Sequence, residues 1–173
     1  MNRLAEISIF STGGTFNKIY NPLNGRLEID PEANALRSIA EKWLCHFDIH
    51  PLIHKDSLEM TDRDREELAA AVDGSPNRKI LIIHGTDTID RTAAHLAKVF
   101  GDSRQILLTG AMIPFSIDPV EATANFASAA GWLLGNDTPG LFIAMHGLLL
   151  PYDRIVKDRE AGRFVKREKP VKN

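Results

Sequence analysis

The chain has 173 residues, and its 21 lysines and arginines nearly balance 23 aspartates and glutamates, which leaves a formal net charge of −2. This balance gives no field that would gather nucleic acid or an acidic membrane, so neither is expected as a partner. The single cysteine excludes an internal disulfide, and the length suits one α/β domain with its own core.

The start of the chain predicts a location in the cytoplasm. Arg3 and Glu6 interrupt its short apolar stretch, which lacks the long uncharged segment and the cleavage site of a secretory signal. No other stretch is long and apolar enough to cross a bilayer. We therefore expect a soluble cytoplasmic protein.

Strand and helix patterns alternate through the first half of the chain. The predicted elements are a buried strand from Leu4 to Phe10, a hairpin arm or edge strand from Arg26 to Ile29, a helix from Asp30 to near Phe47, a strand from Ile49 to Ile53 and a helix from Thr61 to about Val72. Asp30 followed by Pro31 is a typical helix start, and Thr61 is a typical N-cap.

The second half continues the alternation. Its predicted elements are a strand from Ile80 to Ile83, a helix from Asp87 to Phe100, a strand from Ile106 to Leu108, a helix from Pro119 to Leu134 and a strand from Leu141 to Met145. The uninterrupted apolar run at 80–83 is typical of a parallel strand that is buried on both faces. Together the two halves predict an α/β fold with a doubly wound, mainly parallel sheet.

Beyond this domain, which we place at residues 1–156, the composition changes. From Lys157 to Asn173 apolar residues become sparse and basic residues common. This pattern predicts a basic C-terminal tail or a weakly anchored terminal arm.

Ligands of an open parallel sheet bind beyond the carboxyl ends of its strands, and three loops there carry hydroxyl or carboxylate groups. These are the loops at Thr12 to Thr15, at Asp56 to Thr61 with Ser57, and at His84 to Thr88. Taken singly, each has an ordinary structural explanation as a turn, a helix cap or a polar loop. Together they supply the hydroxyls, the carboxylate and the backbone N–H groups of an acyl-transfer site.

The same motifs carry a family resemblance. TGGT at Thr12 to Thr15, Ser57 in DSLEMT, HGTDT at His84 to Thr88 and TGAMIP at Thr109 to Pro114 occur in the order and approximate spacing of the bacterial-type L-asparaginases. The chain resembles that family from about Ile7 to Lys157. The resemblance implies the flavodoxin-like fold of the family's N-terminal domain. It also implies hydrolysis of a small amide, L-asparagine first, to aspartate and ammonia through a threonine-linked acyl-enzyme, with no cofactor.

Residue by residue, the resemblance implies roles for the matching positions. Thr15 matches the primary nucleophile, Thr86 the second catalytic threonine, and Asp87 the aspartate that holds the substrate's α-ammonium. Ser57 matches the serine that binds the α-carboxylate. The neighbouring Gly14, Gly85 and Leu58 are expected to line the substrate site, with Leu58 standing where many relatives have glutamine.

Two further positions follow from spacing within the resemblance. Lys157 falls in register with the family's lysine, and would be the base of a Thr-Lys-Asp triad with Thr86 and Asp87; the alternative is the first residue of a basic tail. Tyr20 is the one tyrosine near enough to Thr15 to be the family's flap tyrosine, although its spacing is short.

The common form of the family carries a second, C-terminal domain that completes the site of a neighbouring subunit. The 173 residues correspond to the N-terminal domain alone, so we expect no C-terminal domain in this chain. A second copy would then cover the site, which predicts a homodimer or larger assembly. Leu148 to Leu150 and Tyr152, which look too apolar for an open loop, are expected near the subunit contact.

Other functions remain as alternatives. The main one is a non-catalytic amino-acid-binding module that keeps Ser57 and Asp87. Nucleotide binding is disfavoured because neither GxGxxG nor GxxxxGK[ST] follows any predicted strand. A metal site at His46, His50 and His54 is also disfavoured, because Pro51 breaks any helix that would hold all three.

Overall fold

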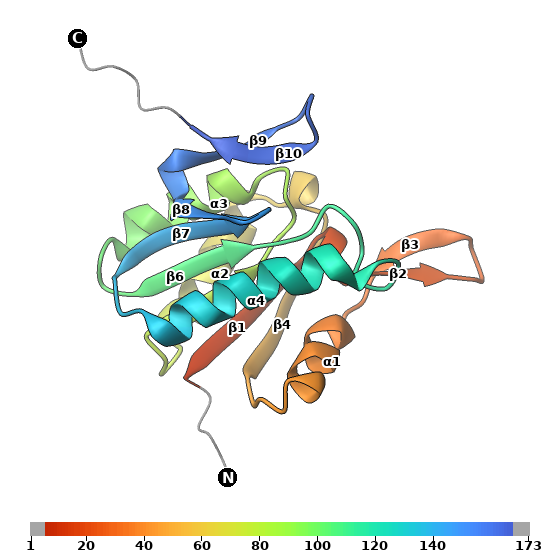
Figure 1. Cartoon of the computed structure of the whole chain (residues 1–173), viewed down its shortest axis with the longest axis horizontal. Coiled ribbons are helices and arrows are strands. Elements are labelled where there is room, and N and C mark those ends of the chain that lie inside the picture. Colours follow the sequence, from red (N-terminus) through yellow and green to blue (C-terminus); the bar gives the residue numbers. More distant parts are fainter. Residues whose placement is uncertain (1–5, 168–173) are drawn as a thin grey trace.

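The computed structural model describes residues 6–167, which form one six-stranded sheet with helices on both faces (Figure 1). The strand order is β4-β1-β5-β6-β7-β8, in which β8 alone runs antiparallel to its neighbour. The strands are β1 (Ile7–Gly13), β4 (Asp48–Lys55), β5 (Lys79–Ile83), β6 (Gln105–Thr109), β7 (Gly140–Met145) and β8 (Leu148–Pro151). The predicted doubly wound, mainly parallel sheet is thereby confirmed.

The order of the parallel strands is that of the flavodoxin-like folds. The chain first adds β4 on one side of β1 and then crosses back to add β5, β6 and β7 on the other side. The connections that leave β1 and β5 therefore diverge, and this switch point opens a crevice at the carboxyl ends of the two strands. The fold thus places the loops after Gly13 and Ile83 side by side.

Four helices cover the sheet: α1 (Asn34–Lys42), α2 (Asp62–Asp73), α3 (Ile89–Phe100) and α4 (Pro119–Gly135). One core cluster joins α2 and α3 to the sheet face that carries Ile80 and Ile82. A second cluster joins α1 and α4 to the opposite face, which carries Leu81 and Ile83. Because β5 contributes to both clusters, its residues from Ile80 to Ile83 are fully buried, as the apolar run predicts.

The helix starts are only partly as predicted. Thr61 caps α2 in a capping box with Asp64, and Asp118 caps α4 ahead of Pro119. The prediction that a helix starts at Asp30 and Pro31 is wrong, because Ala33 has a left-handed backbone with a φ of 52° and α1 begins after it. Asp30 still accepts a hydrogen bond from the backbone N–H of Asn34, the first residue of α1, at 2.8 Å.

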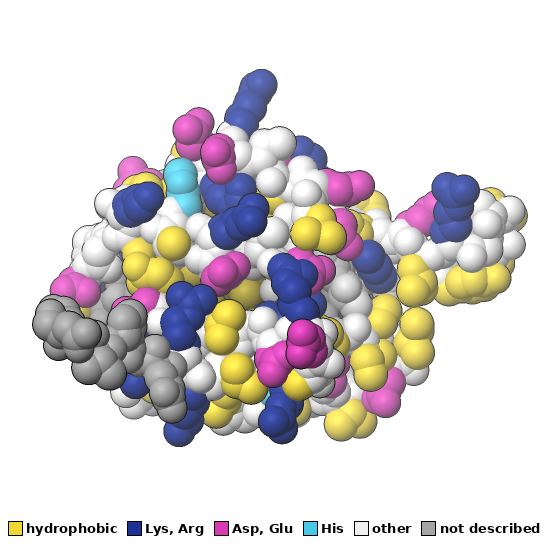
Figure 2. All heavy atoms as spheres, turned by 90° about the horizontal axis from the view of Figure 1, so that it is seen from above, with side chains coloured by type: hydrophobic (Ala, Val, Ile, Leu, Met, Phe, Trp, Pro, Cys, Tyr) yellow, Lys and Arg dark blue, Asp and Glu magenta, His cyan; other side chains and the backbone are white. Residues whose placement is uncertain are grey.

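A hairpin projects from the body of the protein just after the first sheet strand. A short 3-10 turn, η1 (Thr15–Asn17), leads into β2 (Lys18–Asn21), which pairs with β3 (Arg26–Ile29). Figure 1 shows this hairpin extending away from the sheet. In the view of Figure 2 it is the lobe at the right, with hydrophobic side chains along one side. Its tip carries Leu23, which is 95% exposed.

The C-terminal elements were not predicted as strands. A turn, η3 (Tyr152–Arg154), connects β8 to a second hairpin of β9 (Ile155–Asp158) and β10 (Arg163–Lys166). Ile155 and Phe164 anchor this hairpin in the core beside α3. The predicted basic tail or arm therefore begins as an anchored arm as far as residue 167, and the rest of it lies outside the described residues.

The apolar residues expected at a subunit contact have partners inside this chain. Leu148, Leu150 and Tyr152 pack against the core cluster of α2 and α3, and Leu149 packs against that of α4. Within residues 6–167, no helix has the length and apolar character needed to span a membrane.

Candidate active site

Three loops meet at the switch point with no space for side chains between them. Gly14 has a φ of 72°, and a Cβ on it would lie 2.6 Å from the Cα of Gly85. A Cβ on Gly85 would in turn lie 2.6 Å from the Cβ of Ser57. Glycine is required at both positions because any larger residue would force the loops apart. This contact sets Thr15, the residue after Gly14, beside the other two loops.

Lys157 joins the loop after β5 from the C-terminal hairpin. Its Nζ donates to Thr86 Oγ1 at 2.8 Å and to Asp87 Oδ1 at 2.9 Å. Thr86 is 6% exposed, and the side chain of Lys157 is 14% exposed. A buried ammonium so close to a hydroxyl can exchange a proton with it, and the carboxylate offsets its charge. The structure thus brings three of the predicted catalytic residues together.

Asp87 has a second cation that the sequence reasoning missed. Arg159 Nη1 donates to Asp87 Oδ1 at 2.9 Å, and Nη2 donates to the backbone carbonyl of Asp87 at 3.0 Å. Arg159 follows β9, in the turn of the hairpin, so its approach to Asp87 becomes readable only once the hairpin is known.

Ser57 presents a buried hydroxyl with an unused hydrogen-bonding capacity. The residue is 1% exposed, and its Oγ has no partner within residues 6–167. A buried hydroxyl without a partner is costly, so its retention is consistent with a group that bonds a ligand. The preceding Asp56 forms an ion pair with Lys18 at 2.9 Å, and this hydrogen bond holds the pKa of the Asp56 carboxyl below its ordinary value.

An open cleft of about 570 Å³ lies beside Asp87 and the loop after β4. Asp87, Leu58 and the Lys18–Asp56 pair line one part of it, and the base of the β2–β3 hairpin lines the other. Leu58 is 68% exposed there. Of the predicted substrate-binding residues, Leu58 and Asp87 line this cleft, while Ser57, Gly85 and Thr86 lie in the same loops at this edge of the sheet.

Tyr20 is the predicted site residue that the structure does not bring to the others. It lies on β2, is 61% exposed, and its hydroxyl is near Gly25 at the tip of the hairpin. Within residues 6–167 no side-chain hydrogen bond joins it to Thr15, Thr86 or Lys157. A catalytic role for Tyr20 would require the hairpin to bend toward the cleft.

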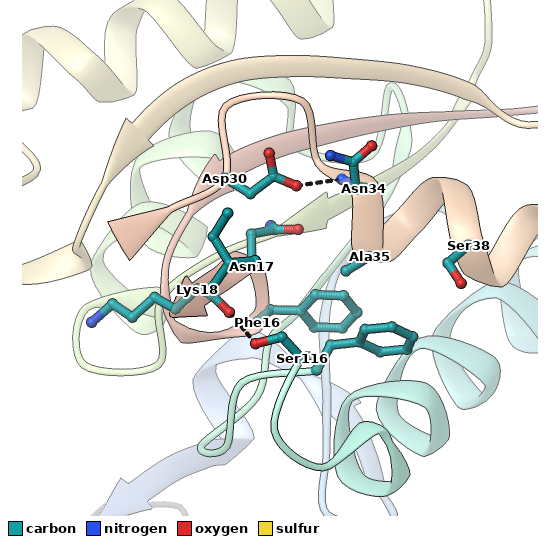
Figure 3. A pocket seen from close by; sticks show the side chains of 10 residues that line it. Phe16, Asn17, Lys18, Asp30, Asn34, Ala35, Ser38 and Ser116 are labelled. Carbon is teal, nitrogen blue, oxygen red and sulfur yellow. Dashed lines mark hydrogen bonds between the residues drawn. The ribbon is translucent and has the colours of Figure 1, made fainter. Parts of the chain in front are cut away.

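A second cavity of about 260 Å³ lies at the base of this hairpin, between Phe16 and α1 (Figure 3). Phe16 and Phe115 stack there with ring centroids 6.5 Å apart. Ser116 Oγ donates to the backbone carbonyl of Lys18 at 2.7 Å, which ties the hairpin to the loop before α4. The lining is largely apolar and contains none of the predicted site residues, so we do not assign the chemistry to it.

A buried network holds two of the three loops from behind, those after β4 and β5. His84 Nδ1 lies 2.7 Å from the carbonyl of Gly85, so Nδ1 must carry the proton that it donates. Nε2 is then an acceptor, and Thr92 Oγ1 donates to it at 2.8 Å while accepting from Arg65 Nε at 3.1 Å. Burial lowers the pKa of His84 to about 4; the hydrogen bond to Gly85 opposes this effect, and the charge of Arg65 adds a smaller lowering. The imidazole is therefore neutral at physiological pH.

The same arginine reaches the Ser57 loop. Arg65 is 6% exposed, its Nη2 lies 3.5 Å from Thr88 Oγ1, and Thr88 donates to the carbonyl of Ser57 at 2.8 Å. One buried guanidinium thus links the loop after β5 to the loop after β4. Sequence reasoning did not single out Arg65, since an arginine in an acidic, solvent-facing helix pattern gives no signal of burial.

Two of the three histidines that recur at intervals of four, His50 and His54, have separate partners. His50 Nε2 is 2.7 Å from Asp48 Oδ2, whereas His54 Nε2 is 3.1 Å from the carbonyl of Pro31. Among residues 6–167, no group of three or more His, Cys, Asp or Glu side chains is arranged to hold a metal ion.

The chain is similar to known proteins in both sequence and fold. A family model described as "Asparaginase, N-terminal" matches residues 6–163. Among solved structures, the thermostable L-asparaginase from Thermococcus kodakarensis matches with a TM-score of 0.82 and 21% identity over 95% of this chain and 52% of its own. A probable cytoplasmic L-asparaginase from Campylobacter jejuni matches with a TM-score of 0.77 and 22% identity over 94% and 53%.

L-asparaginase I from Vibrio cholerae O1 biovar eltor is similar to the same extent, with a TM-score of 0.74 and 22% identity over 95% of this chain and 52% of its own. At these identities the likeness to solved structures concerns the fold. The chain spans about half the length of the structures it matches.

Proposed function

Since this chain belongs to the asparaginase family by the match over residues 6–163, we propose that it hydrolyses the amide of L-asparagine, or of a closely related small amide, through Thr15. The observation that carries the proposal is the cluster of Lys157, Thr86 and Asp87 beside the Gly14–Gly85 contact. A hydroxyl nucleophile needs a basic group close by, and this cluster supplies an amine at the switch point of the sheet.

The proposed reaction has two halves. The reacting form holds Lys157 as a neutral amine, after its resting ammonium has given one proton to solvent. Thr15 Oγ attacks the amide carbon, its proton passes through Thr86 to this amine and on to the leaving nitrogen, and ammonia departs as the C–N bond breaks. Water then attacks the Thr15 ester, and the same groups return the proton to Thr15 as the acid product leaves. Ser57 Oγ, buried and without a partner within residues 6–167, would hold the substrate's carboxylate.

The rest of the proposal concerns the setting of the enzyme. We propose a cytoplasmic location for the protein, in keeping with the name of the Campylobacter protein. We also propose that Tyr20 takes part when the hairpin bends toward the cleft. A second copy of the chain would cover the site. The alternative is a non-catalytic amino-acid-binding module, which the wide opening of the 570 Å³ cleft favours.

The test is ammonia release by Thr15→Ala. Loss of the nucleophile should lower turnover of asparagine by at least roughly 10³-fold, and Thr86→Ala should lose most activity too. Both variants should unfold at nearly the wild-type temperature. Thr138→Ala, which removes an exposed threonine far along the chain, is the matched control and should leave turnover unchanged.

Two results would contradict the proposal. Turnover by Thr15→Ala close to that of the wild type would exclude Thr15 as nucleophile. A wild-type protein that binds aspartate but releases no ammonia from any of a panel of small amides would favour the binding module instead.

A further inference from the structure

Asp87 is shared by two cations that end on the same oxygen. Lys157 Nζ and Arg159 Nη1 each lie 2.9 Å from Oδ1. Arg159 adds a bond from Nη2 to the backbone carbonyl of the same residue at 3.0 Å. The guanidinium therefore fixes both the side chain and the main chain of Asp87, which an isolated lysine could not do.

The charges of this group add to a positive total. Asp87 carries one negative charge and its two partners carry two positive charges, while the neighbouring Lys18–Asp56 pair is neutral. Two other carboxylates line the cleft: Glu28, which accepts from Asn21 and Asn24, and Glu59. A substrate ammonium that approaches Asp87 would thus meet two cations that already bond the same carboxylate oxygen, although the lining as a whole is not positively charged.

The two cations differ in how firmly they are held. The side chain of Lys157 is 14% exposed, but that of Arg159 is 62% exposed and lies at the turn that follows β9. Lys157 also bonds Thr86 and belongs to the proposed proton path. Arg159 touches neither threonine, so its contacts concern Asp87 alone.

We propose that Arg159 is a specificity-determining residue that weakens the contribution of a substrate's α-ammonium to binding at Asp87. The protein therefore accepts monoamides of dicarboxylic acids that lack an α-ammonium more readily than a site with Lys157 alone would. This inference rests on the proposed function in one respect, namely that the substrate binds at Asp87.

The experiment compares two dicarboxylates that differ only in the ammonium group. The affinities of L-aspartate and succinate are measured by titration calorimetry for the wild type, Arg159→Gln and Arg159→Lys. The matched control is Arg163→Gln, which removes the same charge from an exposed position on the same hairpin.

In Arg159→Gln the affinity for aspartate relative to succinate should rise by about tenfold, the size expected for one partly screened charge at close range. The ratio should rise by less in Arg159→Lys, which keeps the charge but not the forked contact. In Arg163→Gln it should match that of the wild type. The ratio of kcat/KM for asparagine over succinamate should move in the same direction.

An unchanged aspartate-to-succinate ratio in Arg159→Gln overturns the inference, as does an equal rise in Arg163→Gln or a wild type that binds neither compound. Failure of the proposed function gives a different result. A shifted binding ratio without ammonia release would refute hydrolysis and leave the role of Arg159 standing.

Discussion

The imidazole of His84 is completely buried at the end of β5, one residue before the closest contact between the loops. Its two bonds fix the tautomer, since Nδ1 donates to the carbonyl of Gly85 and Nε2 accepts from Thr92. A proton on Nε2 would remove that acceptor and place a second positive charge beside Arg65. The resting geometry of the loop therefore depends on a neutral ring.

This dependence predicts a loss of stability on acidification. The pKa of His84 is lowered to about 4 from an ordinary 6.5, so between these values the unfolded chain binds a proton that the folded chain does not. The free energy of unfolding should fall as the pH drops from about 6.5 to about 4, by up to roughly 3 kcal/mol, with no further contribution from His84 below that. Urea unfolding across this range measures it.

His84→Asn keeps an amide near the position of Nδ1 but cannot titrate, so its curve should be flatter in this window. His46→Asn, at an exposed position, should follow the wild type. The pKa values of Asp56 and Asp64 are lowered from 3.8, so these two carboxyls change the free energy of unfolding below that pH, outside the range from 4 to 6.5. Equal slopes for wild type and His84→Asn would show that the imidazole is protonated in the folded protein.

At the level of elements, α2 does more than cover the sheet. It carries Arg65, whose guanidinium is buried and bonds Thr92 Oγ1 and the carbonyl of Met60. Through Thr88 it also approaches the Ser57 loop. The helix thus connects two of the three loops of the site, and the orientation of α2 becomes part of the site geometry.

Removal of this connection should affect both stability and substrate binding. Arg65→Met leaves buried hydroxyls without their donor, which should lower the free energy of unfolding by about 1–3 kcal/mol. It should also raise KM more than it lowers kcat, because Ser57 loses its support while Thr86 and Lys157 do not. Arg63→Met, at an exposed position of the same helix, is the control. Equal stability and KM for the two variants would contradict a supporting role for Arg65.

The sequence predicted elements where the pattern is local and strong. The apolar run of β5, the capped start of α2 and the Asp-Pro start of α4 lie within a residue or two of prediction. The start of α1 was misjudged because a left-handed Ala33 interrupts an otherwise good helix start, and alanine gives no sign of that backbone. β9 and β10 were missed because their four-residue strands are rich in charged residues and have few apolar positions.

For the site, the sequence identified the motifs but not their supports. Gly14, Ser57, Gly85, Thr86 and Asp87 stand in recognisable motifs, and the structure places all of them at one sheet edge. Lys157 was placed by register within the resemblance. Arg65 and Arg159 reach the site through contacts with residues that lie 23 to 72 positions away in the sequence. No local sequence pattern encodes such contacts.

For the whole molecule, the cleft is open to solvent and the hairpin beside it exposes Leu23 and, in part, Ile19 and Leu27. Fixed donors stabilise an oxyanion better when water is excluded, and exposed apolar groups favour a partner surface. We predict a homodimer or larger assembly in which a second copy covers the cleft. Multi-angle light scattering measures the size of the assembly, and the activity per chain is measured as the protein is diluted.

Specific activity should fall as dilution produces monomers. A polar substitution of Leu149 cannot test the assembly, because Leu149 is partly buried and packs against the core cluster of α4 in its own chain. Light scattering of a monomer at the assay concentration, with full activity per chain, would contradict cover by a second copy and favour a site that works while open.

The anchoring of the C-terminal hairpin has a consequence for the timing of synthesis. Thr15 and the loop at Thr86 leave the ribosome long before Lys157, which lies 71 residues beyond Thr86. The five parallel strands can be translated in full while the amine that contacts Thr86 is still within the ribosome. A nascent chain would hold the sheet and its threonines without the amine. The contacts of Lys157 with Thr86 and Asp87 therefore form only after the β9–β10 hairpin has been translated and has docked.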